Sequence, residues 1–191
     1  MSFYVVMIRT VSILAIVGMI GAVALFALNA SAAGRARLRE RFAGGSVDLL
    51  RQAALVALVA MLGSLYLSNG VGFTPCVLCW YQRIAMYPLV VIAGVGALTR
   101  DANAWRYGLP LSVTGLLIAL YHVALQYQPA LDVVSCDASA PCTGRHVLVF
   151  GFISIPVLSG AAFALITALL LTVRTAARGE ASDAIEASVE D

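Results

Sequence analysis

The chain has 191 residues, of which 61% are hydrophobic and 12% are charged, and its formal net charge is +2. Ordinary soluble domains have about 25% charged residues, so this composition excludes a water-soluble globular domain. The small net charge also predicts no nucleic-acid partner.

Five apolar stretches come close to the ~20 residues that a helix needs to cross a bilayer. Inside lipid the backbone must satisfy its own hydrogen bonds, so these stretches are predicted to be helices rather than strands. They cover residues 10–30, 49–67, 80–98, 107–127 and 147–173. The sequence therefore predicts an all-α, polytopic membrane protein. A four-helix transmembrane bundle over residues 49–174 follows one extra N-terminal transmembrane helix over residues 1–30.

The first apolar stretch has two interpretations. Arg9, the apolar run and the segment Asn-Ala-Ser-Ala at residues 29–32 imitate a signal peptide with a small-residue cleavage site. Cleavage there would send Cys76 and Cys79 to the cytoplasmic side. The four arginines within residues 35–41 favour the other interpretation, an uncleaved helix whose N-terminus lies outside.

Two segments outside the apolar stretches are predicted to be cytoplasmic. Residues 31–48 form a polar connector that is expected to be partly helical over residues 35–42. Residues 175–191 are rich in alanine, serine, aspartate and glutamate, which predicts a disordered tail. In the last apolar stretch, Pro156 is expected to kink the helix within residues 151–156, because proline removes a helix hydrogen bond.

Arginine sets the predicted orientation, since the chain contains no lysine. Nine arginines fall in one set of alternate gaps and three in the other, and the richer side is expected to face the cytoplasm. The nine are Arg35, Arg37, Arg39, Arg41, Arg51, Arg100, Arg106, Arg174 and Arg178; the three are Arg9, Arg83 and Arg145. Both cysteine pairs, Cys76 with Cys79 and Cys136 with Cys142, then face the extracytoplasmic space, where disulfides can persist.

The motif Pro-Cys-Val-Leu-Cys at residues 75–79 is predicted to begin a helix. Unpaired backbone N–H groups at a helix N-terminus stabilise a thiolate, so the pKa of a cysteine there is expected to fall. Arg83 follows Cys79 by four residues and therefore lies on the same helix face. A guanidinium beside a thiolate is expected to lower the pKa of that cysteine further.

Two other roles for the cysteines remain open. As structural crosslinks, the pairs would close loops of only seven and four residues, worth ~2.4 and ~1.9 kcal/mol, and such short bridges are more typical of redox-active disulfides. As zinc ligands, Cys136 and Cys142 would have five intervening residues, outside the usual two to four. Neither alternative is favoured, and no metal is expected.

His122 and Gln126 lie one helical turn apart, towards the extracytoplasmic end of the fourth apolar stretch. An ionisable residue within a membrane helix is a functional candidate. A histidine that only hydrogen-bonds a neighbouring helix is an equally good interpretation from the sequence.

These motifs resemble a known family. Residues 72–83 (Gly-Phe-Thr-Pro-Cys-Val-Leu-Cys-Trp-Tyr-Gln-Arg) resemble the first active-site loop of the disulfide bond formation protein B (DsbB) family. Residues 121–126 and 151–156 resemble parts of its third and fourth core helices, so the resemblance covers roughly residues 50–173. The second cysteine pair is closely spaced, as in the compact, BdbC-like members of Gram-positive bacteria. The extra first helix has no counterpart in the four-helix core.

The resemblance implies a quinone-dependent dithiol oxidase of the cell membrane, with ubiquinone or menaquinone as acceptor. It implies a DsbA-like thioredoxin-fold partner, whose thiolate attacks Cys136. Cys142 and Cys76 would then link the two loops. Cys79 would pass electrons to the quinone with the help of Arg83, and His122 would lie near the quinone. The second loop is shorter than in the best-known members, and this departure concerns the inter-loop step.

Three other functions remain as alternatives. A vitamin K epoxide reductase-like enzyme would share the helix bundle and the Cys-x-x-Cys motif, although the neighbouring residues match less well. A transmembrane reductant conduit would need a cytoplasmic electron carrier, and no cysteine is predicted on that side. A membrane anchoring protein would use its cysteines only as crosslinks.

Overall fold

The computed structural model describes residues 3–132, 140–145 and 147–190. Within these ranges the fold is all-α, with six helices: α1 (Phe3–Ala30), α2 (Ala32–Arg41), α3 (Ser46–Leu65), α4 (Val77–Leu98), α5 (Trp105–Tyr127) and α6 (Ile155–Glu190). A π-helical turn, Tyr66–Gly70, extends α3, and short 3₁₀ turns, Ala102–Ala104 and Pro129–Leu131, flank α5. All described helices except α2 are long and apolar enough to cross a membrane, so the five predicted membrane helices are confirmed, although the last begins later than expected.

The helix α6 is the centre of the bundle. It packs against α1, α3 and α5, while α4 packs between α3 and α5. In the most apolar part of each helix, 61% of the residues of α6 are buried inside the protein but only 11% of those of α1. The core includes Leu50, Leu89 and Phe163, and Phe163 fits against Gly115 of α5, where a Cβ atom would find no room.

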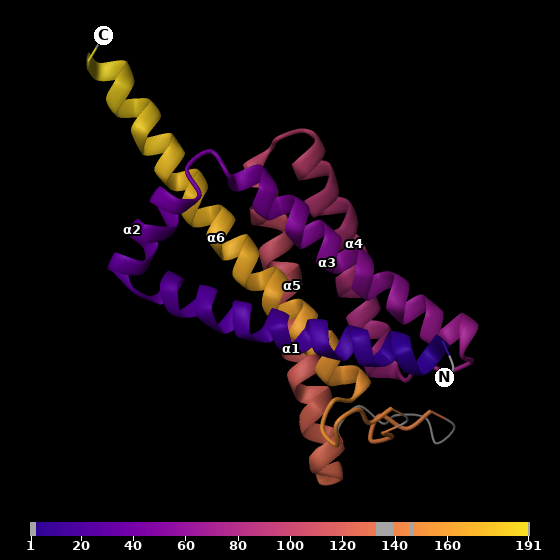
Figure 1. Ribbon diagram of the computed structural model, residues 1–191. Coiled ribbons are helices and arrows are strands. Elements are labelled where there is room, and N and C mark those ends of the chain that lie inside the picture. Colours follow the sequence, from indigo (N-terminus) through magenta and orange to yellow (C-terminus); the bar gives the residue numbers. More distant parts are fainter. Residues whose placement is uncertain (1–2, 133–139, 146, 191) are drawn as a thin grey trace.

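The extra N-terminal helix packs against α6: Ala22 of α1 lies in one buried cluster with Ala164 and Ala168, and Asn29 donates to the Thr172 hydroxyl at 3.1 Å. In Figure 1, α1 crosses α6 obliquely, and α2 then leads to the beginning of α3. The connector is helical as the sequence predicts: α2 begins after Ser31, whose hydroxyl accepts a hydrogen bond from the Gly34 N–H at 3.0 Å. An N-terminal cap of this kind stabilises a short helix.

The beginning of α6 corrects one prediction. The expected helix over residues 147–173 with a kink within residues 151–156 is wrong, because α6 begins only at Ile155. The preceding residues make a tight turn, in which Gly151 has a φ of +82°. Pro156 lies in the first turn of α6, where a backbone N–H has no helical partner and proline is therefore tolerated without a kink.

The end of α6 corrects a second prediction, that of a disordered tail. Residues 175–191 were expected to be disordered, whereas α6 continues to Glu190. Alanine, arginine and glutamate extend an existing helix at little cost, because the unfavourable nucleation step is already complete. The first part of this extension is also packed: the Glu180 carboxylate accepts hydrogen bonds from the Gly44 N–H at 3.1 Å and the Ser46 hydroxyl at 3.4 Å.

Candidate active site

The first cysteine pair lies where α4 begins. Cys76 is the N-cap of α4, and its sulfur accepts a hydrogen bond from the Cys79 backbone N–H at 3.4 Å. The two sulfur atoms are 2.9 Å apart, and both cysteines are free thiols. The predicted position of the pair at a helix N-terminus is confirmed. Side chains this close can join in a disulfide after a small rotation.

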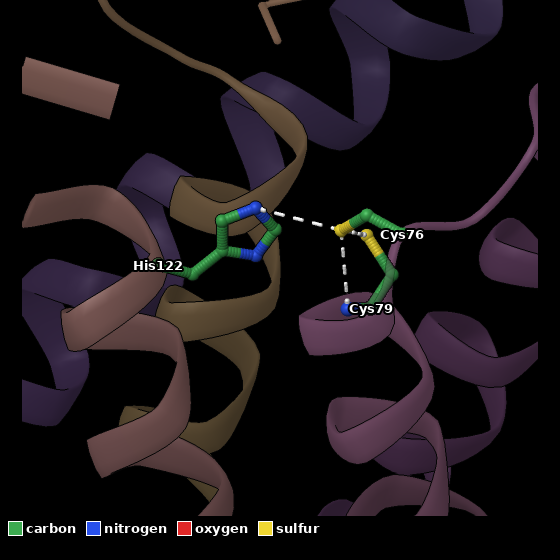
Figure 2. A group of neighbouring side chains, drawn as sticks. All are labelled: Cys76, Cys79 and His122. Carbon is green, nitrogen blue, oxygen red and sulfur yellow. Dashed lines mark hydrogen bonds between the residues drawn. The ribbon is translucent and has the colours of Figure 1, made fainter. Parts of the chain in front are cut away.

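The imidazole of His122 reaches this pair from α5. Figure 2 shows the ring pointing across from α5 towards the sulfurs at the beginning of α4, with Nε2 3.8 Å from the Cys76 sulfur. The side chain of His122 is only 2% exposed. The sequence left two roles open for His122, and the structure places its ring beside the Cys76–Cys79 pair.

Two further hydrogen bonds determine which nitrogen of His122 carries the proton. Nε2 is 3.0 Å from the carbonyl oxygen of Cys142, which can only accept, so Nε2 must be protonated. Nδ1 is 3.1 Å from the side-chain nitrogen of Gln82, which can only donate, so Nδ1 accepts. Gln82 thus orients the ring so that its Nε2–H faces both Cys76 and the second cysteine loop.

These contacts stabilise the Cys76 thiolate. The pKa of Cys76 falls from the ordinary 9.0 to about 4, chiefly because the Cys79 thiol donates a hydrogen bond to its sulfur. The hydrogen bond from His122 and the one from the Cys79 backbone N–H lower the pKa further, while burial opposes the shift. The helix N-terminus contributes as predicted. The main donor to the Cys76 sulfur is the neighbouring Cys79 thiol.

The lowered pKa predicts an unusual pH dependence of alkylation. In the reduced protein, Cys76 should react with iodoacetamide at an almost constant rate between pH 6 and pH 8, and the rate should fall only as the pH drops through about 4. The sign follows because the thiolate is the reactive form and persists above its pKa. An ordinary thiol is only about 0.1% thiolate at pH 6.

Peptide mass spectrometry after timed quenching identifies the alkylated residue and gives its rate. The urea-unfolded protein is the control, and its cysteines should react about tenfold more slowly for each pH unit below 8. A folded protein whose Cys76 follows the same profile as the unfolded chain would contradict the predicted thiolate.

The second cysteine loop packs onto the first pair. Cys142 is 1% exposed, lies in the same buried cluster as Cys76, and takes part in a disulfide. Cys136 lies outside the described residues. Gln126 holds the loop: its amide nitrogen donates to the Gly144 carbonyl at 3.1 Å, and its amide oxygen accepts from the Ser154 hydroxyl at 2.6 Å. Gln126 therefore positions the loop rather than touching the sulfurs.

Arg83 lies one turn below Cys79 and is anchored to α3. Its Nε donates to the Ser64 hydroxyl at 2.9 Å, and one terminal nitrogen donates to the Ser64 carbonyl at 3.0 Å. The guanidinium also lies 5.1 Å from the ring centre of Trp80. The expected shared face is confirmed, because Arg83 and Cys79 line the same cavity.

That cavity has a volume of about 510 Å³ and is bounded by α1, α3, α4 and α6. Its lining is mostly apolar, with a small polar region where Cys76, Cys79, Arg83 and His122 meet. Tyr87, one turn beyond Arg83, also lines the cavity, and its buried hydroxyl has no hydrogen-bond partner among the described residues. A cavity of this size and polarity is typical of sites for organic ligands, and an orphaned hydroxyl is suited to donate to a ligand oxygen.

Cys76, Cys79 and His122 also form a possible metal-binding group, with ligand atoms within 4.8 Å of one another. The hydrogen bonds of His122 disfavour that use. Nε2 carries a proton that the Cys142 carbonyl accepts, so this nitrogen has no lone pair for a metal. The site is therefore better suited to thiol chemistry than to zinc.

Three residues of the site were not identified from the sequence: Gln82, Ser64 and Tyr87. Gln82 carried a signal, because it is a polar residue three positions after Cys79 in an otherwise apolar helix, and it is 6% exposed. Tyr87 continues the spacing of four residues that joins Cys79 to Arg83. Ser64 carried no distinguishing signal, since serine is common in membrane helices.

Comparisons with known proteins agree with this geometry. The sequence model of the family "disulfide bond formation protein DsbB" matches residues 48–173. The probable disulfide formation protein C of Halalkalibacterium halodurans is 47% identical over 120 residues, which cover 62% of this chain and 88% of that protein. Disulfide bond formation protein C of Bacillus subtilis is 46% identical over 113 residues, covering 59% and 82%.

A probable disulfide formation protein of Metapseudomonas resinovorans is 38% identical over 136 residues, which cover 69% of this chain and 92% of that protein. No solved structure matches the chain.

Proposed function

Since the chain belongs to the DsbB family of disulfide bond formation proteins, we propose that this membrane oxidoreductase passes electrons from a DsbA-like, thioredoxin-fold dithiol to a quinone. One observation carries the proposal: Cys76, Cys79, His122 and the second cysteine loop meet at the polar end of an apolar cavity. Sulfurs at such a position can exchange with a soluble thiol on one side and with a lipid-soluble acceptor on the other.

The residues of the cavity fit a quinone. Its apolar walls suit a ring with an apolar tail, and Arg83 and the orphaned Tyr87 hydroxyl are donors suited to quinone oxygens. A bound quinone supplies the electron acceptor, because it takes up two electrons and two protons to become a quinol. Whether ubiquinone or menaquinone serves depends on the membrane in which the protein lies.

The cysteines supply the electrons. In the reduced pair, Cys76 is a thiolate that accepts a hydrogen bond from the Cys79 thiol. When the pair closes to a disulfide, it loses two electrons and the one remaining proton, and solvent provides the second proton that the acceptor requires. We assign Cys79 as the electron donor to the acceptor, because Arg83 follows it by one turn on the same face of α4.

The second loop then restores the reduced pair. In this proposal the partner's thiolate attacks Cys136 and releases the Cys142 thiolate, which attacks Cys76 and displaces Cys79. The partner's second thiol then displaces Cys136 and completes the partner's own disulfide, so the partner loses two electrons and two protons in total. The freed Cys136 thiolate attacks Cys142, which re-forms the disulfide of the second loop and releases Cys76 as the thiolate of the reduced pair. Support comes from His122, whose Nε2 touches both Cys76 and the Cys142 backbone, so the two loops are already together. The burial of Cys142 disfavours direct attack on it by a folded protein.

The proposal requires both cysteine pairs on the extracytoplasmic face of the cell membrane, as the arginine distribution predicts. Labelling introduced surface cysteines with a membrane-impermeant maleimide in whole cells tests this orientation. Cysteines in the turn before Trp105 should be protected, whereas those near Pro129 should react. The opposite pattern would remove the exported electron donor and with it the proposed function.

Quinone reduction by purified protein tests the activity directly. Protein in detergent is pre-reduced, freed of reductant and mixed with quinone, and the loss of quinone absorbance is followed over a single turnover. A reduced DsbA-like protein is then added to measure steady turnover. The expected result is one quinol for each reduced cysteine pair. Cysteines that only crosslink would leave the quinone unchanged.

Replacing Arg83 with alanine should weaken the apparent affinity for quinone by about 10- to 100-fold, because a hydrogen bond from a charged group contributes ~1.5–3 kcal/mol. The concentration dependence of the single-turnover rate measures this affinity. Two controls separate charge from geometry. Arg83→Lys keeps the charge without the forked contact to Ser64, and Ser64→Ala removes the hydroxyl that anchors the guanidinium. A normal affinity in Arg83→Ala would rule out its assignment as a quinone-binding residue.

A further inference from the structure

The extra helix α1 forms one wall of the cavity that contains Cys79. Val11, Leu14 and Ala15 of α1 line this cavity. α1 packs against α6 but makes no close backbone contact with α3 or α4 among the described residues. The cavity lies in the space between α1 on one side and α3 and α4 on the other. α1 also lies outside residues 48–173, so this wall is an addition to the part of the chain that the family model matches.

The cavity opens between α1 and α3. Leu14 and Val17 of α1 line it and are 58% and 61% exposed. Leu55 and Val59 of α3 line it from the other side and are 61% and 45% exposed. Side chains that both line a cavity and reach the outer surface mark its entrance. Because α1 and α3 span the membrane, this entrance faces lipid hydrocarbon.

We infer that α1 is the binding wall for the polyprenyl tail of the quinone. The inference rests on the proposed function and adds a role for the helix that lies outside the family match. The two donors assigned to the quinone ring, Arg83 and Tyr87, lie with Cys79 on α4, whereas the α1 residues that line the cavity are all apolar. A quinone has the same division, a polar ring and an apolar tail. The ring is therefore assigned to the α4 side and the tail to the entrance between α1 and α3.

The test compares two tryptophan substitutions on α1. Val11→Trp fills the cavity, while Ile13→Trp, two positions along the same helix, adds the same side chain on the outer face, where Ile13 is 52% exposed and does not line the cavity. Each pre-reduced variant is titrated with decylubiquinone and with the tail-less 2,3-dimethoxy-5-methyl-1,4-benzoquinone in single-turnover reactions. Loss of burial for about two methylene groups lowers affinity about tenfold.

The expected result is an apparent affinity for decylubiquinone that falls about tenfold in Val11→Trp and is unchanged in Ile13→Trp. The tail-less quinone should react equally with both variants and the unmodified protein, which also shows that Val11→Trp is folded. Equal effects of the two substitutions, or an equal loss for the tail-less quinone, would overturn the inference. If the unmodified protein reduced neither quinone, the proposed function itself would fail.

A second measurement does not depend on activity or on the folding of a variant. A decylubiquinone analogue with a diazirine in its tail is photolysed with the unmodified protein, and the labelled peptides are identified by mass spectrometry. Labelling within residues 7–18 that excess decylubiquinone suppresses supports the tail site. Suppressible labelling confined to other segments would overturn it.

Discussion

Replacing Cys79 with serine is expected to abolish quinone reduction, with a single-turnover rate at least ~10³-fold below that of the unmodified protein. A serine hydroxyl cannot form a disulfide with Cys76, so the pair has no two-electron oxidised state. The sulfur of Cys79 is 2.9 Å from that of Cys76 and lines the cavity assigned to the acceptor, and the described residues contain no third free cysteine that could take its place. Stopped-flow quinone absorbance after pre-reduction measures the rate.

The neighbouring Val77→Ala is the matched control, because it alters the same first turn of α4 without touching a sulfur. It should retain turnover within about threefold of the unmodified protein. Thermal unfolding of Cys79→Ser in detergent shows whether the bundle is intact. Unchanged quinone reduction in a folded Cys79→Ser protein would remove Cys79 from the electron path and with it the proposed function.

Replacing His122 with alanine is expected to slow electron transfer from the second loop to the first pair by about 10- to 100-fold. The hydrogen bond from Nε2 to the Cys76 thiolate is worth ~1.5–3 kcal/mol, and its loss should raise the pKa of Cys76. With a higher pKa, Cys76 becomes protonated at a higher pH than in the unmodified protein. Alkylation near pH 5 should therefore slow, while alkylation near pH 8 should be almost unchanged. Steady turnover with a reduced DsbA-like protein and the alkylation profile measure the two effects.

His122→Gln is the informative control, since its amide places an N–H near the position of the imidazole Nε2. It should restore part of the lowered pKa of Cys76 and part of the turnover. In His122→Ala, Gln82 and the Cys142 carbonyl also lose buried partners, which costs about 1–3 kcal/mol of stability for each group. A variant that is only destabilised would keep the unmodified alkylation profile, and that result would contradict a role for His122 at the thiolate.

Much of the bundle followed from local patterns. Apolar runs of sufficient length predicted every membrane helix, and the proline before Cys76 with the apolar run behind it predicted the N-terminal position of the cysteine pair. The apolar run over residues 147–173 gave a wrong start for the last helix, because apolar residues have the same hydropathy in a tight turn and in a helix. The prediction of a disordered tail was wrong because the composition of the tail is compatible with disorder as well as with helix. A helix already formed by packing continues through it to Glu190.

The sequence predicted the contacts within one helix of the site but not the contacts between helices. Cys79 and Arg83 share a helix, so their spacing predicted a common face. His122 is 46 residues from Cys76, and its contact with that sulfur depends on how α5 is rotated against α4. The same holds for Ser64, which is 19 residues from Arg83 and reaches it only because α3 packs beside α4.

The sequence by itself determined the class of the protein, its membrane spans and the sulfur chemistry at the start of α4, because hydropathy, length and helix capping act over one or two turns of chain. The tertiary structure alone decided which sulfur is the thiolate, which nitrogen of His122 carries the proton, and that α1 closes the cavity beside Cys79. Those features depend on the rotation and crossing of whole helices, and contacts between residues far apart in the chain set them.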